Sequence, residues 1–573
     1  MKKKFLSMLL VLSLCLGLFA ACGASQSAEE ISAASDGETV EVSTPVSEDT
    51  APTPIEASER ESETVAVPEE TAITLPLTTE PAEVTVWYAG SPNQMPYLED
   101  GTYTNTAANK AVSDATGIDI EFTTVSNESA VDSFNLMIAS NDLPDIIDSF
   151  TNFYTLGMDY AVNEEEIVYD LAPYLEESVP NYYRILEENP DVKRDVTTDT
   201  GIIGGIYTLT TGNAYNGQGL SIRSDMLEAV GADIPVTYGE FEETVKSIYD
   251  QTGVQGALIY KNFFGQYFAG GFGTYAKLTT APDINYPIYQ VDGQVTFAPL
   301  TEEYREYITT MQRWYQEKVI YQDYYVYSNP GELEGVITSG AASVAMGSGS
   351  ELETRNADAD YEWLPMTDLV KQKGDIIHTG TAPYAEGDIT ISKIEVITTQ
   401  CRDLELVLSL FNYMFSEEGS MLASYGVENE TFVYDDAGKP VLTDLIMKDE
   451  NIGANQAVEL HLTTVASLID ATRTASAVTQ YQKDCYDLWT SNMDDAYTLA
   501  ASVLALKTEE ADTINRVSGD IVTYLEESNV KFITGALNTD SDFDAFIEAL
   551  KDMGIQDMID AYQAAYDRYL ARG

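Results

Sequence analysis

Strand-like and helix-like segments alternate between residues 84 and 148, and this alternation constrains the fold more than any other feature of the sequence. The strand-like runs are rich in β-branched and aromatic residues, whereas the segments between them have helical composition over about a dozen residues each. In chain order, the five segments are 84–88, 105–115, 118–122, 129–140 and 144–148. Such a series is typical of a βαβαβ unit with a mostly parallel sheet, so we expect an α/β fold.

The ends of these runs carry the first candidate ligand residues. In open α/β sheets, ligands bind beyond the carboxyl ends of the strands. Tyr88 and Asp148 end the first and third runs, and Asn152 follows shortly after. Further along, 342–349 is a strand-like run of small residues that leads into a glycine loop. This pattern places Ser348 at the end of a strand.

The composition indicates a large and strongly acidic globular protein. The chain has 573 residues, of which 44% are hydrophobic, so it exceeds one small domain and can bury a core. Asp and Glu number 94 against 30 Lys and Arg, which gives a net charge of −64. A charge of this sign repels the phosphates of nucleic acids, so we exclude nucleic acid as a partner.

The N-terminus has the pattern of an export signal. Lysines at positions 2–4 precede an apolar run over 5–19, and small residues at 20–21 precede Cys22. The run is shorter than the roughly 20 residues that span a bilayer, which favours cleavage over a retained anchor. The segment FAAC at 19–22 resembles the lipobox of bacterial lipoproteins. We predict a signal peptide over 1–21 and a lipid on Cys22; the alternative is ordinary cleavage that leaves a free thiol.

Two further stretches are informative by what they lack. Residues 23–83 contain no Phe, Trp or Tyr and a single basic residue, Arg60, so we predict that 22–83 comprises the lipidated cysteine and a disordered acidic tether. Residues 455–518 contain neither Gly nor Pro, and we predict that they are almost wholly helical.

Thr237 and Glu240 have the spacing of a capping box at the start of a helix.

The sequence offers little for catalysis or metal binding. Neither His378 nor His461 belongs to an HExxH pair, and no GxSxG or GxxxxGK[ST] motif occurs. The acidic residues at 540–544 resemble the start of a calcium loop, but Ala545 stands where glycine is required. We therefore predict no catalytic residue, no metal and no cofactor. Cys401 and Cys485 could pair or stay free, because sequence separation does not give their distance.

Five segments, taken in order, resemble the extracellular solute-binding lipoproteins of bacterial ABC importers, in their large carbohydrate-associated group. The segments are LMIASNDLPD (136–145), IRSDML (222–227), FSEEG (415–419), KFITG (531–535) and AYDRY (565–569). Many relatives carry a calcium loop after the helix that follows the Pro235–Thr237 region, whereas 249–253 here lacks its oxygen ligands. We assign no calcium ion to that stretch.

The resemblance implies a type II, two-lobed periplasmic-binding-protein-like fold with a helical C-terminal extension. The β-rich stretches 206–223 and 389–398 match the strands that cross between the lobes in the family. We therefore expect one lobe from 84–220 plus 390–455, and the other from 221–389 plus 456–573. The ligand would bind between them. The implied partners are a carbohydrate, the ABC permease subunits and the membrane through the lipid anchor, and we expect a monomer on the extracellular face.

Sugar binding calls for aromatic faces and for polar groups that match hydroxyls. Trp363 lies beside a strand-to-loop junction and is a candidate stacking platform, whereas Trp314 and Trp489 fall in helical patterns and are expected in the core. Arg223 would bridge a ligand or, alternatively, pair with Asp225. The candidate ligand residues are Tyr88, Asp148, Asn152, Tyr207, Arg223, Ser348 and Trp363.

Three functions fit these observations. The first is the substrate-binding component of an ABC transporter, which delivers an extracellular carbohydrate, expected to be an oligosaccharide, to a permease without turnover. The second is a membrane-anchored glycoside hydrolase with two carboxylates. The third is a receptor for another ligand, such as a peptide. The ordered family segments favour the first, and cleavage of an oligosaccharide would identify the second.

Overall fold

The computed structural model describes residues 73–572 except 93, 214, 216, 262–265, 277–286, 329, 381–386, 449–453, 476–477 and 500–503. The predicted signal peptide and Cys22 lie outside the described residues. The predicted tether, however, overlaps them from residue 73, and there the structure corrects the prediction. Ile73, Leu75 and Leu77 pack against the core, and the backbone N–H of Leu77 donates to the carbonyl of Thr116 at 2.8 Å. The folded body therefore begins before residue 84.

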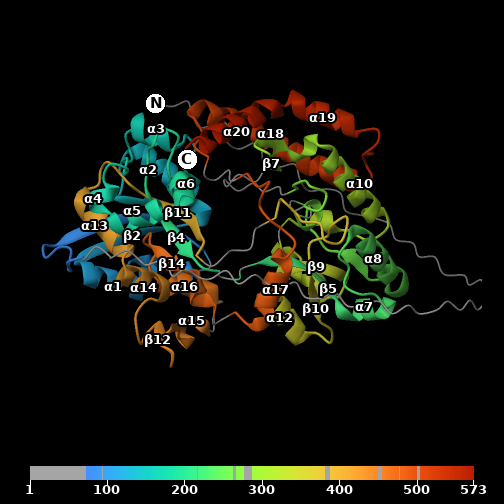
Figure 1. The fold of residues 1–573 in the computed structure, drawn as a ribbon, viewed down its shortest axis with the longest axis horizontal. Helices are drawn as coiled ribbons and strands as arrows, with labels where there is room; N and C mark the ends of the chain where they lie inside the picture. Colours follow the sequence, from blue (N-terminus) through green and yellow to red (C-terminus); the bar gives the residue numbers. More distant parts are fainter. Residues whose placement is uncertain are drawn as a thin grey trace, which may run out of the picture. The chain divides into compact units, whose positions relative to one another are not determined.

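The first lobe is built on a six-stranded sheet with the order β14-β4-β11-β3-β1-β2 (Figure 1). Strand β11 runs antiparallel to both neighbours, and the other pairs are parallel. The strands are β1 (Ala82–Gly90), β2 (Ile118–Ser126), β3 (Ile146–Asp148), β4 (Ile206–Thr211), β11 (Ile389–Ile397) and β14 (Leu468–Asp470). The βαβαβ unit predicted for 84–148 is confirmed, because β1, β2 and β3 all belong to this sheet.

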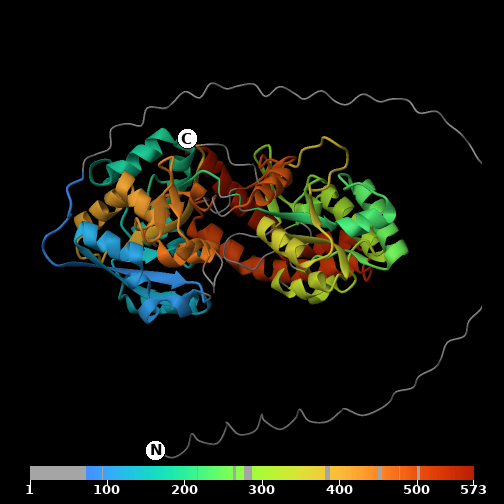
Figure 2. The same ribbon diagram turned by 90° about the horizontal axis from the view of Figure 1, so that it is seen from below.

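Helices cover both faces of this sheet, so its central strands are apolar on both sides. One core contains Val84 and Ile120, and a second, on the opposite face, contains Trp87 and Phe134. Figure 2 shows the orange segments, including α13 and α14, among the blue and teal ones. The helices are α1 (Ala107–Thr116), α2 (Ala130–Ser140), α3 (Met158–Asn163), α4 (Leu175–Ser178), α5 (Pro180–Glu188), α6 (Pro190–Val196), α13 (Leu404–Met414), α14 (Glu417–Tyr425), α15 (Asp444–Met447) and α16 (Ala454–His461), and a hairpin joins β12 (Phe432–Tyr434) to β13 (Pro440–Leu442).

The second lobe contains a four-stranded sheet with the order β10-β5-β9-β6. Its strands are β5 (Gln218–Arg223), β6 (Gln255–Ala257), β9 (Ala342–Ser348) and β10 (Trp363–Met366), and a separate hairpin joins β7 (Ile288–Val291) to β8 (Gln294–Phe297). Its helices are α7 (Ser224–Val230), α8 (Tyr238–Thr252), α9 (Gln266–Ala269), α10 (Glu302–Gln316), α11 (Glu334–Thr338), α12 (Gly349–Asp358) and α17 (Gln480–Thr490). The predicted capping box of Thr237 and Glu240 starts α8. Trp314 and Trp489 are 0% and 3% exposed, which confirms their predicted place in the core.

The expectation for 455–518 is wrong in part. Among the described residues of this stretch, only those of α16, α17 and the start of α18 (Thr508–Ile533) are α-helical. Strand β14 interrupts the helices because it pairs with the outer edge of β4, where Leu468 aligns with Leu209. Absence of Gly and Pro permits a helix but does not prevent a short strand from completing a sheet. The lobe boundaries stay a prediction; β14, which falls in 456–573, lies in the first sheet.

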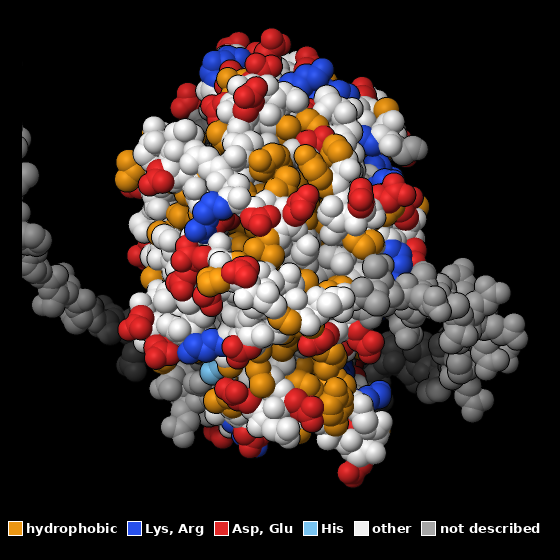
Figure 3. Space-filling view, turned by 90° about the vertical axis from the view of Figure 1, so that its left-hand side faces the viewer, with side chains coloured by type: hydrophobic (Ala, Val, Ile, Leu, Met, Phe, Trp, Pro, Cys, Tyr) orange, Lys and Arg blue, Asp and Glu red, His pale blue; other side chains and the backbone are white. Residues whose placement is uncertain are grey.

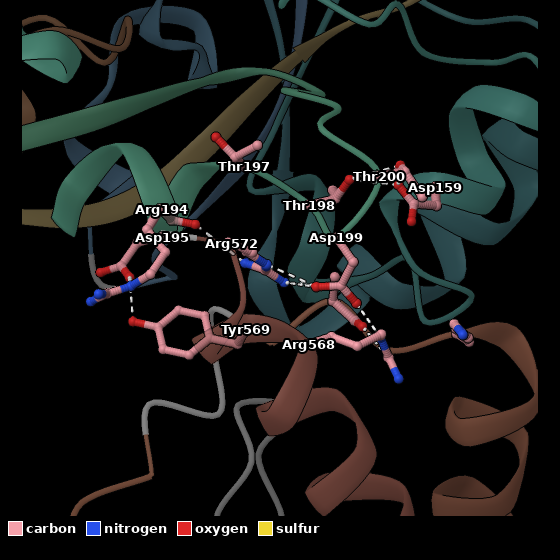
Figure 4. Close-up of polar contacts among 12 residues, drawn as sticks. Asp159, Arg194, Asp195, Thr197, Thr198, Asp199, Thr200, Arg568, Tyr569 and Arg572 are labelled. Atoms are coloured by element: carbon pink, nitrogen blue, oxygen red, sulfur yellow. Dashed lines mark hydrogen bonds and ion pairs between the residues drawn. The ribbon is translucent and has the colours of Figure 1, made fainter. Parts of the chain in front are cut away.

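Three C-terminal helices connect the second lobe to the first. Helices α18, α19 (Phe543–Asp552) and α20 (Ile555–Leu570) contribute to the second lobe's core. At the end of α20, Arg568 and Arg572 both pair with Asp199, which follows α6 in the first lobe (Figure 4). The hydroxyl of Tyr569 donates to Asp195 at 2.6 Å. These contacts form what we call the C-terminal clasp.

Among the residues that the structure describes, no helix is both long enough and apolar enough to span a membrane.

Candidate functional site

The carboxyl end of β1 and β3 forms the first part of the candidate site. Strand β3 aligns Ile147 with Trp87 of β1, and Asp148 with Glu395 of β11. Tyr88 therefore continues the same row as Asp148 and Glu395, and side chains in one row of a sheet share a face. The structure thus brings together two predicted site residues, Tyr88 and Asp148.

A β-bulge adds a lysine to this row. Strand β11 pairs with β4 at Ile391 and again at Ile394, and the register shifts between the two pairs. Bulges turn a side chain out of its regular direction, and they are common beside functional sites. Here the Nζ of Lys393 lies 2.6 Å from Oδ1 of Asp148 and 5.0 Å from the centre of the Tyr88 ring. It also donates to the carbonyl of Thr464 at 2.6 Å.

The charges in this cluster neutralise one another inside the protein. Asp148 and Glu395 are 2% and 1% exposed. Burial disfavours the ammonium of Lys393, but Asp148, Tyr88 and Glu395 together outweigh that effect, and the pKa of Lys393 is raised. Burial raises the pKa of Glu395 to about 7 and that of Tyr88 to about 12. We call Tyr88, Asp148, Lys393 and Glu395 the Lys393 cluster, and its lysine is fully engaged by acceptors.

Polar side chains extend the cluster beyond the end of β1. The Tyr88 ring packs edge-on against Tyr103, with the ring centres 4.8 Å apart. The hydroxyl of Tyr103 donates to the side-chain oxygen of Gln94 at 2.9 Å, and the amide of Gln94 in turn donates to Glu459. An aromatic ring beside hydrogen-bonding groups can bind a solute that has both apolar faces and hydroxyl edges.

The edge of the second sheet forms the other part of the candidate site. Strand β5 begins at Gln218, which aligns with Ser348 at the end of β9. Residues 212–217 connect β4 to β5, so this edge is within about 25 Å of the end of β4 along the chain. A groove of about 440 Å³ lies beside it, and its lining includes Gln218, Met346, Gly347, Glu351 and Arg355.

Ser348 lies at this edge as expected, but its side chain also stabilises the start of a helix. It is the N-cap of α12 and forms a capping box with Glu351. The backbone N–H of Ser348 donates to Oε2 of Glu351 at 2.7 Å. Substitutions here would therefore affect the start of α12 as well as any contact with a ligand.

The structure corrects the expected position of Trp363. It belongs to β10, is 1% exposed, and packs in a core cluster with Trp489 and Leu352. The hydroxyl of Tyr481 donates to its carbonyl at 3.0 Å. The neighbouring Pro365 does not end the strand, because Trp363 to Met366 pair with β5. A buried indole offers no face for stacking in this structure.

The remaining predicted residues are separated from the Lys393 cluster. Tyr207 aligns with Ile394 and so lies on the opposite face of the sheet from Asp148. Asn152 is exposed at the end of a short 3₁₀ helix, Phe150–Asn152. Arg223 is 6% exposed and pairs with Asp225 at 2.6 Å, so the alternative role stated for it is confirmed.

Three other titratable side chains pair with or pack against residues of the folded protein: His378, Cys401 and Cys485. His378 Nδ1 lies 2.9 Å from Asp494, an ion-pair geometry on the side of the second lobe. Cys401 and Cys485 are free, and they pack beside or within different core clusters. Among the described residues, no group of three or more His, Cys, Asp or Glu side chains could hold a metal ion.

Sequence reasoning missed Lys393 and Glu395. Both lie in the β-rich stretch ITISKIEVIT at 389–398, where they are its only charged residues. Charged residues inside an otherwise apolar strand indicate either an exposed face or a buried pair. That pattern could have drawn attention to them, but their partner Asp148 is 245 positions away in the sequence.

Comparison with known proteins supports one assignment. The family model described as "Bacterial extracellular solute-binding protein" matches residues 96–421. Lipoprotein LipO of Bacillus subtilis (strain 168) is 24% identical over 333 residues, which are 56% of this chain and 63% of that protein. The chain thus matches less than two thirds of the length of this curated relative.

Solved structures share the fold at low sequence identity. The alginate-binding protein AlgQ2 is 18% identical, with a TM-score of 0.63 over 86% of this chain and 99% of that one. An HMO-binding, ABC-transporter-associated solute-binding protein of Bifidobacterium longum infantis is 16% identical, with a TM-score of 0.66 over 85% and 99%. FusA of S. pneumoniae, in complex with kestose, is 17% identical, with a TM-score of 0.60 over 86% and 100%. The fold is the two-lobed α/β fold of these proteins, and it includes C-terminal helices.

Proposed function

Because the chain belongs to the bacterial extracellular solute-binding protein family, we propose that it is the substrate-binding component of an ABC transporter and captures an oligosaccharide. The single observation that carries this proposal is the Lys393 cluster. There, an aromatic ring and buried polar groups stand at the carboxyl end of the first sheet, in the position where α/β sheets bind ligands. The similar structures named above bind carbohydrates, which agrees with this ligand class.

The ligand would bind between the edge that ends in Tyr88 and Asp148 and the edge formed by Gln218 and Ser348. Contacts from both lobes are needed, because a ligand shifts an open–closed equilibrium only by its different affinity for the two states. A hinge of a few residues where the chain crosses between the lobes would absorb the rotation without disturbing either core. Asn152, which is exposed, stays a candidate for a contact at the periphery of this site, whereas Tyr207 lies on the opposite face of the sheet.

A neutral glycan fits the charges better than an anionic one. Lys393 already contacts Asp148 and the carbonyl of Thr464, so it is not available to a ligand carboxylate. Acidic side chains are also spread over the face of the molecule shown in Figure 3. Repulsion from this acidic surface would lower the local concentration of an acidic sugar.

The remaining features of the proposal concern location and partners. We propose that a lipid on Cys22 anchors the protein to the extracellular face of the cell membrane, and that the protein works as a monomer with a membrane permease. The family consists of binding proteins, and we propose that this chain has no turnover. Release of products from an oligosaccharide would favour the glycoside hydrolase instead.

A binding screen tests the proposal. We expect kestose, other neutral oligosaccharides, or both to raise the melting temperature, since a ligand at 100 times its Kd stabilises the native state by about 2.7 kcal/mol. Alginate oligosaccharides serve as the acidic comparison. The variant Tyr88→Ala should weaken binding of the active sugar by about tenfold, because the ring would supply apolar contact area. Failure of every sugar to bind would contradict the proposed function.

A further inference from the structure

A buried carboxylate in the second lobe has no hydrogen-bond donor. Asp368 is 6% exposed, and among the described residues no hydrogen bond or ion pair reaches either of its carboxylate oxygens; Oδ1 is completely buried without a partner. Burial raises its pKa well above the ordinary value. Buried carboxylates in native proteins are normally paired or hydrogen-bonded, so an unpartnered one calls for an explanation.

Asp368 lies at the edge where the candidate site was placed. Strand β10 ends at Met366 and runs antiparallel to β5, with Met366 aligned to Leu220. The chain beyond Met366 therefore continues toward the start of β5 at Gln218, which is also the edge where β9 ends. Two residues after the strand, Asp368 follows this direction.

Two neighbours of Asp368 also have unused oxygen atoms. Oγ1 of Thr367 and Oδ1 of Asn492 are buried and have no hydrogen-bond partner. The side-chain amide of Asn492 donates to the backbone carbonyl of Asp368 at 3.0 Å, which holds the end of α17 against this segment. Both side chains are partly exposed as a whole, so the group borders the solvent. Three side chains in and against this segment therefore have a buried oxygen atom without a hydrogen-bond partner.

We propose that Asp368, together with Thr367 and Asn492, accepts hydrogen bonds from hydroxyl groups of the captured solute; this inference rests on the proposed function. Sugar hydroxyls are donors, and hydrogen bonds from them would stabilise the ionised carboxylate of Asp368, which burial alone disfavours. A calcium ion is a poorer match, because it takes six to eight oxygen ligands, usually from several carboxylates, and the group contains one. The ligand would thus supply the donors that the protein lacks here.

Asp145 in the first lobe provides a matched control. It is 3% exposed, but its carboxylate accepts from the backbone N–H of Thr85 at 2.8 Å and from Arg402 at 2.6 Å. Burial opposes ionisation, yet these hydrogen bonds lower the pKa of Asp145 to about 2. The two carboxylates are equally buried and differ in whether they have partners.

The experiment compares Asp368→Asn with Asp145→Asn in the mature protein. Without ligand, we expect the melting temperature of Asp368→Asn to rise by about 1–3 °C, because the change removes a buried carboxyl group that must either stay charged without a partner or take up a proton on folding. Asp145→Asn should lower it, since it removes a paired one. With the oligosaccharide that binds most tightly in the screen, or with kestose if several bind equally, Asp368→Asn should raise Kd at least about tenfold. Asp145→Asn should leave that Kd within twofold.

Three results would overturn the inference. A lower melting temperature for Asp368→Asn would mean that its carboxylate stabilises the fold. An unchanged Kd in a folded Asp368→Asn variant would mean that it does not contact the sugar. If the wild-type protein binds no sugar, the proposed function fails, and this role for Asp368 fails with it; that result is distinguished from the others because it appears in the wild type.

Discussion

The edges of the two sheets differ in whether their buried acidic side chains have hydrogen-bond partners. In the first lobe, Asp148 is paired with Lys393 at 2.6 Å, and the lysine is shared with a backbone carbonyl. In the second lobe, Asp368 has no donor among the described residues. At the first edge, the acidic side chain has its partner before a ligand binds. At the second edge, the ligand would supply the missing hydrogen-bond donors. We propose that the first lobe supplies a preorganised surface and that the second lobe supplies acceptors whose hydrogen bonds the ligand completes.

The largest expected effect is a loss of stability when Lys393 is removed from the buried ion pair at the edge of the first sheet. Lys393→Met keeps the length of the side chain but leaves Asp148 and Glu395 buried without a cation. Removal of one partner from a buried ion pair costs about 3–5 kcal/mol, because the other charge stays uncompensated. Urea unfolding should show this loss. The double variant Lys393→Met/Asp148→Asn should recover part of it, and a double variant no more stable than the single one would contradict the pairing.

A smaller effect, which depends on pH, concerns Glu395 at the same edge of the first sheet. The pKa of Glu395 is raised from 4.5 to about 7 by burial, so its protonated form is favoured in the folded protein. Its contribution to stability is complete below pH 4.5 and is lost as the pH rises through about 7. Relative to Glu395→Gln, the wild-type free energy of unfolding should fall by about 1–3 kcal/mol over that interval. Parallel pH profiles for the two proteins would show that Glu395 is not shifted.

The smallest expected effect concerns the C-terminal clasp, which connects the second lobe to the first. Asp199→Asn weakens the C-terminal clasp, in which Arg572 is 4% exposed at its side chain. We expect a loss of about 1–2 kcal/mol, reduced because the asparagine still accepts hydrogen bonds. Asp191→Asn is the control, since the Asp191 side chain is 86% exposed in its pair with Arg194. Equal effects of the two substitutions on unfolding would contradict a special role for the clasp.

Local patterns predicted much of the fold. The alternation over 84–148 gave β1, α1, β2, α2 and β3, and the Thr237 capping box started a helix where expected. These features depend on residues close together in the sequence. Strand β14 was missed because it exists only by pairing with β4, which is more than 250 positions away. Sequence composition does not reveal such a partner.

The candidate site was predicted only in part, for the same reason. Tyr88 and Asp148 were found because the ends of parallel strands meet at one edge. Lys393 was missed because a bulge, not the regular alternation of a strand, sets its direction. Trp363 was misplaced because an aromatic residue near a proline suggested a loop, whereas pairing with β5 carries it into the core.

We propose that a sugar binds between the lobes and draws them together. Small-angle X-ray scattering of the mature protein, with and without a saturating concentration of the oligosaccharide that binds in the screen, tests it most directly. We predict that the radius of gyration decreases on binding, because contacts to both edges stabilise the closed arrangement. An unchanged radius of gyration at a sugar concentration that gives full saturation by calorimetry would contradict this account.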